Sequence, residues 1–125
     1  MAAALILGFV ALHQSMTHRV LEKLQGWRLH TYATTIQNRS GIIAIEKAQP
    51  SDVVYGGGMY DGRFNIDPDV TINGIDRAYA MAILHPKPTR LLEIGLSSGS
   101  WARVIADYEH VQKMTIVEIN PGYLE

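Results

Sequence analysis

The sequence predicts an α/β fold, in which a small N-terminal antiparallel β unit is followed by the start of a parallel sheet. Two observations carry this prediction. The stretch Gly41–Ile66 is rich in β-branched and aromatic residues and is broken by glycines, which is typical of short antiparallel strands. The C-terminal part then alternates strand, helix and strand within about thirty residues, which is the pattern of a βαβ unit with parallel strands.

Composition excludes several function classes. The 125 residues correspond to about one domain, and 11 basic against 12 acidic residues give a net charge of −1. No run of lysine or arginine is present, so no nucleic-acid partner is expected. The absence of cysteine excludes disulfides and thiolate catalysis and fits a cytoplasmic location. The five histidines lack the i, i+4 spacing of a helical metal site, so no metal is expected.

Residues 1–30 are expected to form an apolar or amphipathic helix. The first twelve residues carry no charge, and Arg19, Lys23 and Arg28 follow them as on the cytoplasmic flank of a membrane segment. Because a membrane-spanning helix takes about 20 apolar residues, this run would be the end of a longer one. A helix that stays in water and ends at Gly26 is the alternative. Both interpretations, with and without membrane attachment, stay open.

Residues 31–70 are expected to form a β-hairpin unit. The pair Asp61-Gly62 is a strong turn signal between antiparallel strands. The glycine run Gly56–Gly58 indicates a loop or a bulge. The sequence therefore predicts a short hairpin that reverses at the Asp-Gly pair.

A helix is expected after this unit. Apolar residues recur from Ile75 to Ile83 at i, i+3, i+4, i+7 and i+8, which is the spacing of one buried helix face. Asn73 is placed to cap the N-terminus of this helix, and Pro86 to end it. The chain then alternates a strand over "TRLLEIG", a helix over "SGSWARVIADY" and a strand over "KMTIVEI". Pro121 fits the first turn of a further helix.

The turn between the first of these strands and its helix is rich in small residues. It runs from Gly95 to Gly99 and includes Ser97 and Ser98. Glycine lets a ligand approach the backbone without a Cβ in the way, and the helix N-terminus adds free N–H groups. Glu118 ends the next strand, and an acidic side chain there can accept hydrogen bonds from both hydroxyls of a ribose. Both features belong at the carboxyl edge of the sheet and predict a nucleoside site.

The expected nucleoside lacks phosphate. The dinucleotide fingerprint has its second glycine where this chain has Ser97, and that glycine lets a pyrophosphate come close. S-Adenosylmethionine and its derivatives are nucleosides of the favoured kind. Residues 71–125 are thus expected to form an incomplete Rossmann-like domain of the S-adenosylmethionine-dependent methyltransferase type. The alternative, in which the glycines serve only tight packing and Glu118 is a solvated strand end, stays open.

A longer stretch resembles the aminopropyltransferases, the family of the spermidine synthases. The resemblance rests on "HPKPTRLLEIGLSSGSWARVIADYEHVQKMTIVEINP" and on "VVYGGGMYDGRFN", which is similar to the family's hairpin. It covers Gly41 to Glu125 and is closest to bacterial spermidine-synthase-like domains fused to membrane segments. It implies transfer of an aminopropyl group from decarboxylated S-adenosylmethionine to an amine such as putrescine. Because family members commonly dimerise, it also implies a homodimer.

The resemblance also implies a set of site residues. The implied cofactor-binding residues are Gly95, Ser97, Ser98, Gly99, Glu118 and Asn65. The implied amine-binding residues are Asp61, at the family's hairpin Asp, with Asp76 and Tyr79 as substitutes for a Tyr-His-Glu segment that this chain lacks. No metal is implied.

The chain departs from the family pattern in ways that matter for catalysis. Ser98 and Asn120 stand where the family has Asp, and the family's catalytic Asp lies beyond Glu125, so no catalytic residue is assigned. Two alternatives stay open: a methyltransferase, which Glu93 on the first strand favours, and a nucleoside-binding domain without catalysis. Because a two-stranded parallel sheet exposes an apolar edge and face, the chain is expected to be a fragment or to need a partner.

Overall fold

The computed structural model describes residues 32–125 and, before them, residues 6, 8–10, 12, 13, 16, 19, 20 and 23. The helix expected over residues 1–30 therefore falls mostly outside the described residues. Those described there are helical, and the side chains of Phe9 and Leu12 are 71% and 64% exposed. Within the described part of the chain, no helix combines the length and the apolar character needed to cross a bilayer. Membrane attachment stays a prediction.

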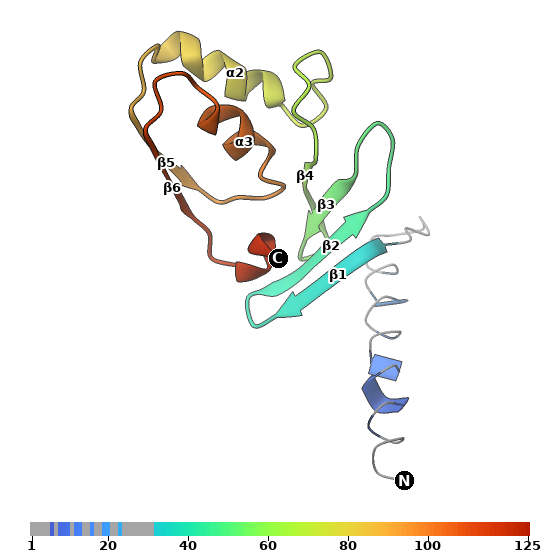
Figure 1. The fold of residues 1–125 in the computed structure, drawn as a ribbon. Coiled ribbons are helices and arrows are strands. Elements are labelled where there is room, and N and C mark those ends of the chain that lie inside the picture. The colour runs from blue at the N-terminus through green and yellow to red at the C-terminus, as the bar shows by residue number, and fades with distance from the viewer. Residues whose placement is uncertain are drawn as a thin grey trace.

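An antiparallel sheet of four strands forms the first unit (Figure 1). Its strands β1 (Tyr32–Asn38), β2 (Gly41–Glu46), β3 (Val53–Gly56) and β4 (Met59–Arg63) pair in chain order. The expected antiparallel unit is confirmed, but it has four strands, and β1 precedes the stretch Gly41–Ile66 in which strands were expected.

Both faces of this sheet are covered at β2. The neighbours Ile43 and Ala44 point to opposite faces, and each is only 3% exposed. Ala44 packs in a cluster with Tyr32 and Tyr55. Ile43 lies against Gly122 near the C-terminus of the chain. One face of the sheet is therefore covered by the C-terminal segment around Gly122, which follows the second sheet in the sequence.

The turn between β3 and β4 is at Gly57 and Gly58, so the expected turn at Asp61-Gly62 is wrong. Both turn glycines have positive φ, at 57° and 84°, which glycine adopts without steric cost. Asp61 lies inside β4 as the extra residue of a β-bulge, where the register between β3 and β4 shifts. The bulge, rather than a turn, sets the position of Asp61.

The second unit is a two-stranded parallel sheet with helices on one face. Strands β5 (Arg90–Ile94) and β6 (Lys113–Val117) pair in parallel, which confirms the predicted strand–helix–strand order. The helices are α2 (Ile75–Leu84) and α3 (Ser100–Ala106), and a 3-10 helix, η1 (Pro121–Leu124), follows β6. The structure is thus mixed α/β, with one antiparallel and one parallel sheet.

The core of the second unit lies between its sheet and its helices. Ile75 and Ala78 of α2 are fully buried and form a cluster with residues of α3, against which Leu91 packs. Ile83, expected on the buried face of α2, is 82% exposed. The opposite face of the sheet is open, since Ile94 is 81% exposed. The exposed apolar face expected for this sheet is therefore present.

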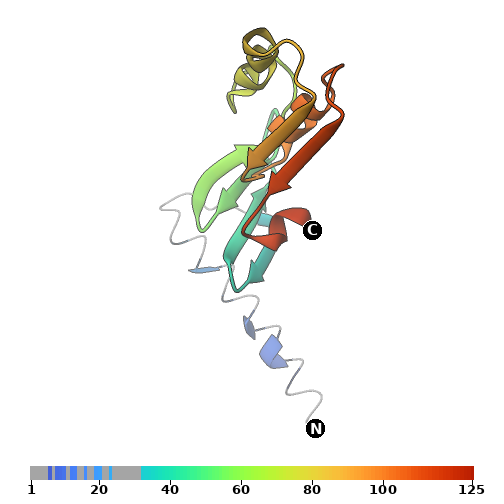
Figure 2. The ribbon, with the colours of Figure 1, turned by 90° about the vertical axis from the view of Figure 1, so that its left-hand side faces the viewer.

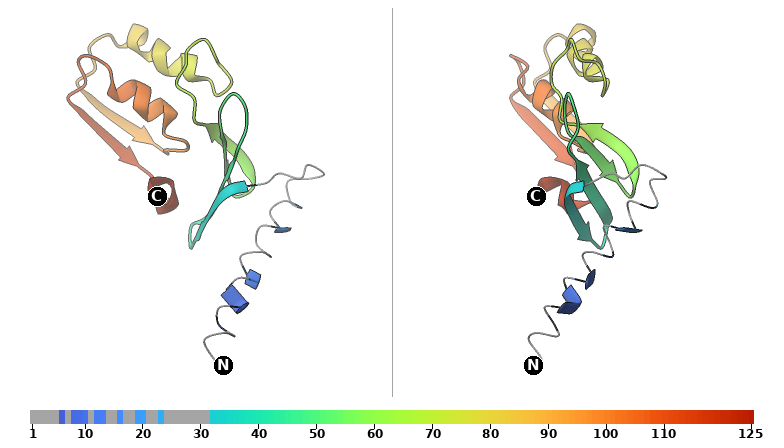
Figure 3. Two further views of the ribbon diagram at one scale, coloured as in Figure 1. Left: turned by 45° about the vertical axis from the view of Figure 1, so that its right-hand side comes forward. Right: turned by 90° about the vertical axis from the view of Figure 1, so that its right-hand side faces the viewer.

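The C-terminal segment returns to the first sheet, where η1 lies beside β1 and β2 (Figures 2 and 3). Gly122 is buried there, and a Cβ on it would stand 3.0 Å from side-chain atoms of Ile36, Asn38 and Ile43. The side-chain amide of Asn38 donates to Asn120 Oδ1 at 2.7 Å. This contact joins the two units along one edge.

Candidate functional site

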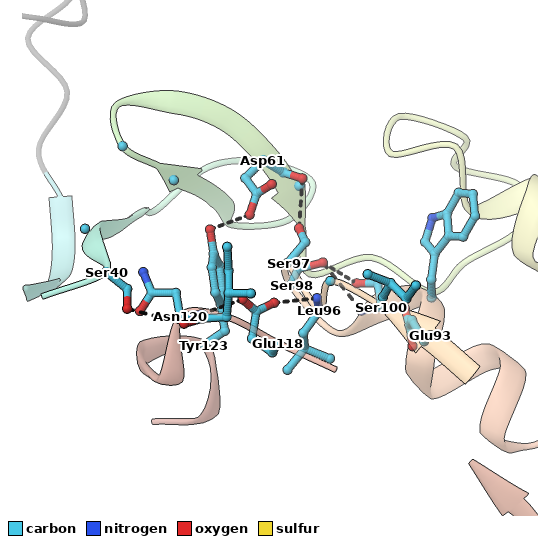
Figure 4. A pocket seen from close by; sticks show the side chains of 18 of the residues that line it. Ser40, Asp61, Glu93, Leu96, Ser97, Ser98, Ser100, Glu118, Asn120 and Tyr123 are labelled. Carbon is cyan, nitrogen blue, oxygen red and sulfur yellow. Dashed lines mark hydrogen bonds between the residues drawn. The ribbon is translucent and has the colours of Figure 1, made fainter. Parts of the chain in front are cut away.

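A cavity of about 710 Å³ lies between the two units (Figure 4). The first unit contributes the β1–β2 turn and the β3–β4 hairpin to its walls. The second contributes the ends of β5 and β6, the glycine turn before α3, and η1. The cavity therefore lies at the carboxyl ends of the parallel strands, where ligands bind in open α/β sheets.

The backbone of the glycine turn is open to this cavity at Gly95. Gly95 has φ 85°, and a Cβ on it would meet no atom within 4 Å. Its N–H donates to Val117 O at 2.8 Å and so extends the parallel pairing into the turn. Gly99, with φ 73°, is the N-cap of α3 and lies outside the cavity lining. Of the two glycines, Gly95 offers the surface for close approach.

The serines of the turn line the cavity but bind β4. Ser97 Oγ donates to the backbone carbonyl of Asp61 at 2.8 Å, and Ser98 Oγ donates to that of Arg63 at 2.7 Å. Gly62 makes this approach possible, because a Cβ on it would stand 2.5 Å from Ser97 Oγ. The serine hydroxyl protons are therefore used to anchor the turn to the first unit.

The carboxylate of Glu118 meets the same turn. Its Oε2 accepts the backbone N–H of Leu96 at 2.7 Å, and its Oε1 accepts that of Asn120 at 2.8 Å. Each carboxylate oxygen has a second acceptor site. The structure thus brings Glu118 and the glycine turn together at one edge, with acceptor capacity left on the carboxylate.

Asp61 enters the cavity wall from the opposite unit. The phenol of Tyr123 donates to Asp61 Oδ2 at 2.6 Å. Burial raises the pKa of the Tyr123 phenol above its ordinary value, and the bond to Asp61 adds to this effect. The phenol therefore stays a proton donor at neutral pH.

A third carboxylate, that of Glu93 on β5, also lines the cavity. Its Oε2 is buried and has no hydrogen-bond partner among the described residues. Burial raises the pKa of Glu93 above its ordinary value of 4.5. A buried acceptor without a partner is unusual in folded proteins, and a ligand donor would satisfy it.

The cavity lining is acidic. Asp61, Glu93 and Glu118 line it, and no lysine, arginine or histidine among the described residues does. Such a lining attracts cations and repels phosphates and carboxylates. The described residues hold no group of three side chains suited to binding a metal ion.

Besides Gly99, three more expected site residues lie outside the cavity lining: Asn65, Asp76 and Tyr79. Asn65 is 8% exposed, and its amide donates to Asn73 Oδ1 at 3.1 Å within the loop after β4. The N-cap of α2 is Gly74, so the cap expected at Asn73 is wrong; the Asn73 side chain bonds to Arg63 and Asn65 instead. Tyr79 donates to a backbone carbonyl of the same loop, and Asp76 is exposed in the first turn of α2.

Sequence reasoning missed Tyr123 as a site residue and noted Asn120 only as a departure from the family pattern. Both line the cavity because η1 folds back onto the first sheet, which no local pattern signals. Comparison with models of protein families gives no match for this chain, and comparison with curated proteins gives no match either. The features of the cavity that bear on function are its open backbone at Gly95 and its three carboxylates.

Proposed function

We propose that the cavity binds decarboxylated S-adenosylmethionine together with an amine such as putrescine and supports aminopropyl transfer. The observation that carries this proposal is the lining of three carboxylates beside an open glycine backbone, with no basic side chain among the described lining residues. Decarboxylated S-adenosylmethionine carries a sulfonium and an ammonium but no phosphate or carboxylate, so its charge complements the lining. On this proposal, the β5–α3–β6 unit is the start of a Rossmann-like sheet.

The nucleoside would lie over Gly95, where no side chain stands between the ligand and the backbone. Its ribose hydroxyls would donate to the acceptor sites that Glu118 keeps beside its two backbone bonds. The hydroxyls of Ser97 and Ser98 would hold the turn in place rather than contact the ligand, because they donate to β4.

Aminopropyl transfer forms a C–N bond and breaks a C–S bond. The lone pair of a neutral amine attacks the carbon next to the sulfonium, the C–S electron pair goes to sulfur, and 5′-methylthioadenosine leaves. The nitrogen then loses a proton. Carboxylates around the site stabilise the cationic groups of both reactants, and Asp61, which lines the cavity from the first unit, would face the amine. The proton passes to water, since no side chain of this chain is assigned as its base.

A methyltransferase is the second candidate, because Glu93 is an acidic residue on β5 that lines the cavity. Its unpartnered Oε2 suits the ammonium that S-adenosylmethionine and its decarboxylated form both carry, so this contact does not separate the two candidates. The acidic lining opposes the methyltransferase, because the carboxylate of S-adenosylmethionine would find no cationic partner among the described lining residues. The charge of the lining therefore supports the proposal of decarboxylated S-adenosylmethionine over S-adenosylmethionine.

Calorimetric titration of the chain with 5′-methylthioadenosine, decarboxylated S-adenosylmethionine and S-adenosylmethionine tests the proposal. We expect the first two to bind, the third to bind at least about tenfold more weakly, and Glu118→Ala to lose binding. Glu109→Ala is the matched control, because Glu109 is exposed and lies outside this cavity. Preference for S-adenosylmethionine would favour the methyltransferase, and failure of all three to bind would contradict the proposal. Amine-dependent release of 5′-methylthioadenosine would separate transfer from binding alone.

A further inference from the structure

We infer that Tyr123 is a positioning residue, which holds the carboxylate of Asp61 as a recognition site for an alkylammonium group in the cavity. The inference rests on the proposed function, since the ammonium is that of the amine substrate. Its starting point is the bond between Tyr123 Oη and Asp61 Oδ2, at 2.6 Å, which crosses from η1 of the second unit to β4 of the first (Figure 4).

A glycine on a third element makes this contact possible. Gly56 ends β3, and a Cβ on it would stand 2.5 Å from Tyr123 Oη and 3.6 Å from Asp61 Oδ2. Any other residue at this position would push the phenol away from the carboxylate. All three residues line the cavity, so the contact is part of its wall.

The backbone around Tyr123 is held in place independently of Asp61. Asn120 Oδ1 accepts the N–H of Gly122 at 3.1 Å, and Pro121 occupies the first position of η1. Gly122 packs against the first sheet so closely that no side chain would fit there. The phenol therefore projects from a fixed segment, and its hydroxyl acts as a fixed donor.

Asp61 is held at its backbone and at one carboxylate oxygen. Its carbonyl accepts Ser97 Oγ at 2.8 Å, and its Oδ2 accepts the Tyr123 phenol. Its other oxygen, Oδ1, takes part in no hydrogen bond with a described residue. An ordered carboxylate with one free oxygen can bind an ammonium without first breaking an internal bond, which lowers the entropic cost of binding.

The Tyr123 phenol can donate a hydrogen bond to Asp61 throughout the neutral pH range. Burial and the neighbouring carboxylate raise its pKa, so Tyr123 donates and does not act as a base. A neutral donor orients Asp61 and leaves the negative charge of the pair for the ligand. A lysine or arginine in the same place would instead cancel that charge.

Calorimetric titration of the full chain with putrescine tests the inference. We expect Tyr123→Phe to weaken putrescine binding by about tenfold, Asp61→Asn to weaken it by at least as much, and the double variant to bind no more weakly than Asp61→Asn. Tyr60→Phe is the matched control, because Tyr60 lies on β4, is 53% exposed and does not line the cavity. Gly56→Ala provides a second route, because it displaces the phenol while both side chains stay present, and we expect it to reproduce the loss.

A spectroscopic measurement separates positioning from a merely structural role. In the chain labelled with 13C at tyrosine Cζ, the resonance missing from Tyr123→Phe identifies Tyr123. We expect its chemical shift at neutral pH to change in Asp61→Asn, because the carboxylate that accepts the phenol proton is gone. An unchanged chemical shift would show that the pair does not form in solution and would overturn the inference.

The outcomes distinguish this inference from the proposed function. Failure of the unmutated chain to bind 5′-methylthioadenosine, decarboxylated S-adenosylmethionine and S-adenosylmethionine would contradict the proposed function, whereas the putrescine titrations judge the inference by themselves. Wild-type affinity for putrescine in Tyr123→Phe, or an unmutated chain that binds no putrescine, would overturn the inference. Equal losses from Tyr123→Phe in the presence and absence of the Asp61 carboxylate would also overturn it, because Tyr123 would then not act through Asp61.

Discussion

The carboxylate of Glu118 accepts the backbone N–H of Leu96 at 2.7 Å, and this bond ties the end of β6 to the glycine turn after β5. A second bond, from the N–H of Asn120 to the other carboxylate oxygen, ties the same side chain to the start of η1. The Glu118 side chain thus joins two segments of the cavity wall: the turn after β5 and the segment after β6. Glu118 therefore has a structural role in the turn besides the ribose contact proposed for it.

Glu118→Gln should separate these two roles from each other. The amide oxygen of glutamine can still accept one backbone N–H, but its NH2 group faces the other N–H and cannot accept it. We expect the free energy of unfolding to fall by about 1–2 kcal/mol and 5′-methylthioadenosine affinity to fall by about tenfold or more. Denaturant unfolding and calorimetric titration measure the two effects. A variant that keeps both stability and affinity would contradict the assigned contacts.

The two glycines at the ends of the turn should respond differently to alanine. Both have positive φ, so Gly95→Ala and Gly99→Ala should each lower the free energy of unfolding by about 1–2 kcal/mol. Only Gly95 lines the cavity, where its backbone is open. We expect Gly95→Ala to lose nucleoside binding and Gly99→Ala, as the matched control, to keep it. Thermal unfolding followed by titration distinguishes them, and equal binding by both variants would show that the open backbone is not the contact surface.

Much of the second unit could be predicted from the sequence because its signals are local. The apolar spacing from Ile75 identifies α2, and the strand–helix–strand alternation identifies the parallel pairing. Parallel pairing then places the carboxyl ends of β5 and β6 together, which is why Gly95 and Glu118 were expected near each other. The parallel pairing of β5 and β6 thus brings Gly95 and Glu118, which are 23 residues apart in the sequence, to the same cavity.

The rest of the site depends on how the two units pack, and no local signal reports this packing. Tyr123 and Asp61 are separated by 62 residues and meet only because η1 returns to the first sheet. Competing turn signals caused the error in the first unit, since Gly57-Gly58 forms the turn and Asp61-Gly62 the bulge. The bulge matters for the candidate site, because the extra residue that it inserts into β4 is Asp61, which lines the cavity.

Gly62→Ala should loosen the junction between the two units. The added Cβ would stand 2.5 Å from Ser97 Oγ and 3.3 Å from Ser98 Oγ, so the serine turn would have to move away from β4. We expect the free energy of unfolding to fall by about 1–3 kcal/mol. The double variant Gly62→Ala, Ser97→Ala removes the nearest clash and should recover part of this loss relative to the sum of the two single variants. Strictly additive effects in denaturant unfolding would contradict the close contact.

Glu93→Gln should change stability in a pH-dependent manner. Because burial raises the pKa of Glu93 in the folded chain, the protonated form contributes stability below its ordinary value of 4.5, and this contribution is lost as pH rises through the raised folded value. At neutral pH the wild type carries a buried, unpartnered carboxylate oxygen, so we expect the glutamine variant to be more stable by about 1 kcal/mol. The difference should shrink as pH falls toward 4.5. Denaturant unfolding across this range measures it, with Glu109→Gln as a control for the loss of one exposed charge.

The same substitution should act on ligand binding with the opposite sign. If Glu93 serves the cationic end of decarboxylated S-adenosylmethionine, Glu93→Gln should bind it several-fold more weakly while it unfolds at higher denaturant concentration. If Glu93 only packed in the core, its replacement would lower stability and leave the preference for a cationic ligand unchanged. It would not raise stability and weaken binding together. Lower stability of Glu93→Gln at neutral pH would show that the carboxylate has a partner in solution, and unchanged affinity would remove Glu93 from the proposed site. Gain of stability together with loss of affinity is the result that the unpartnered oxygen leads us to expect.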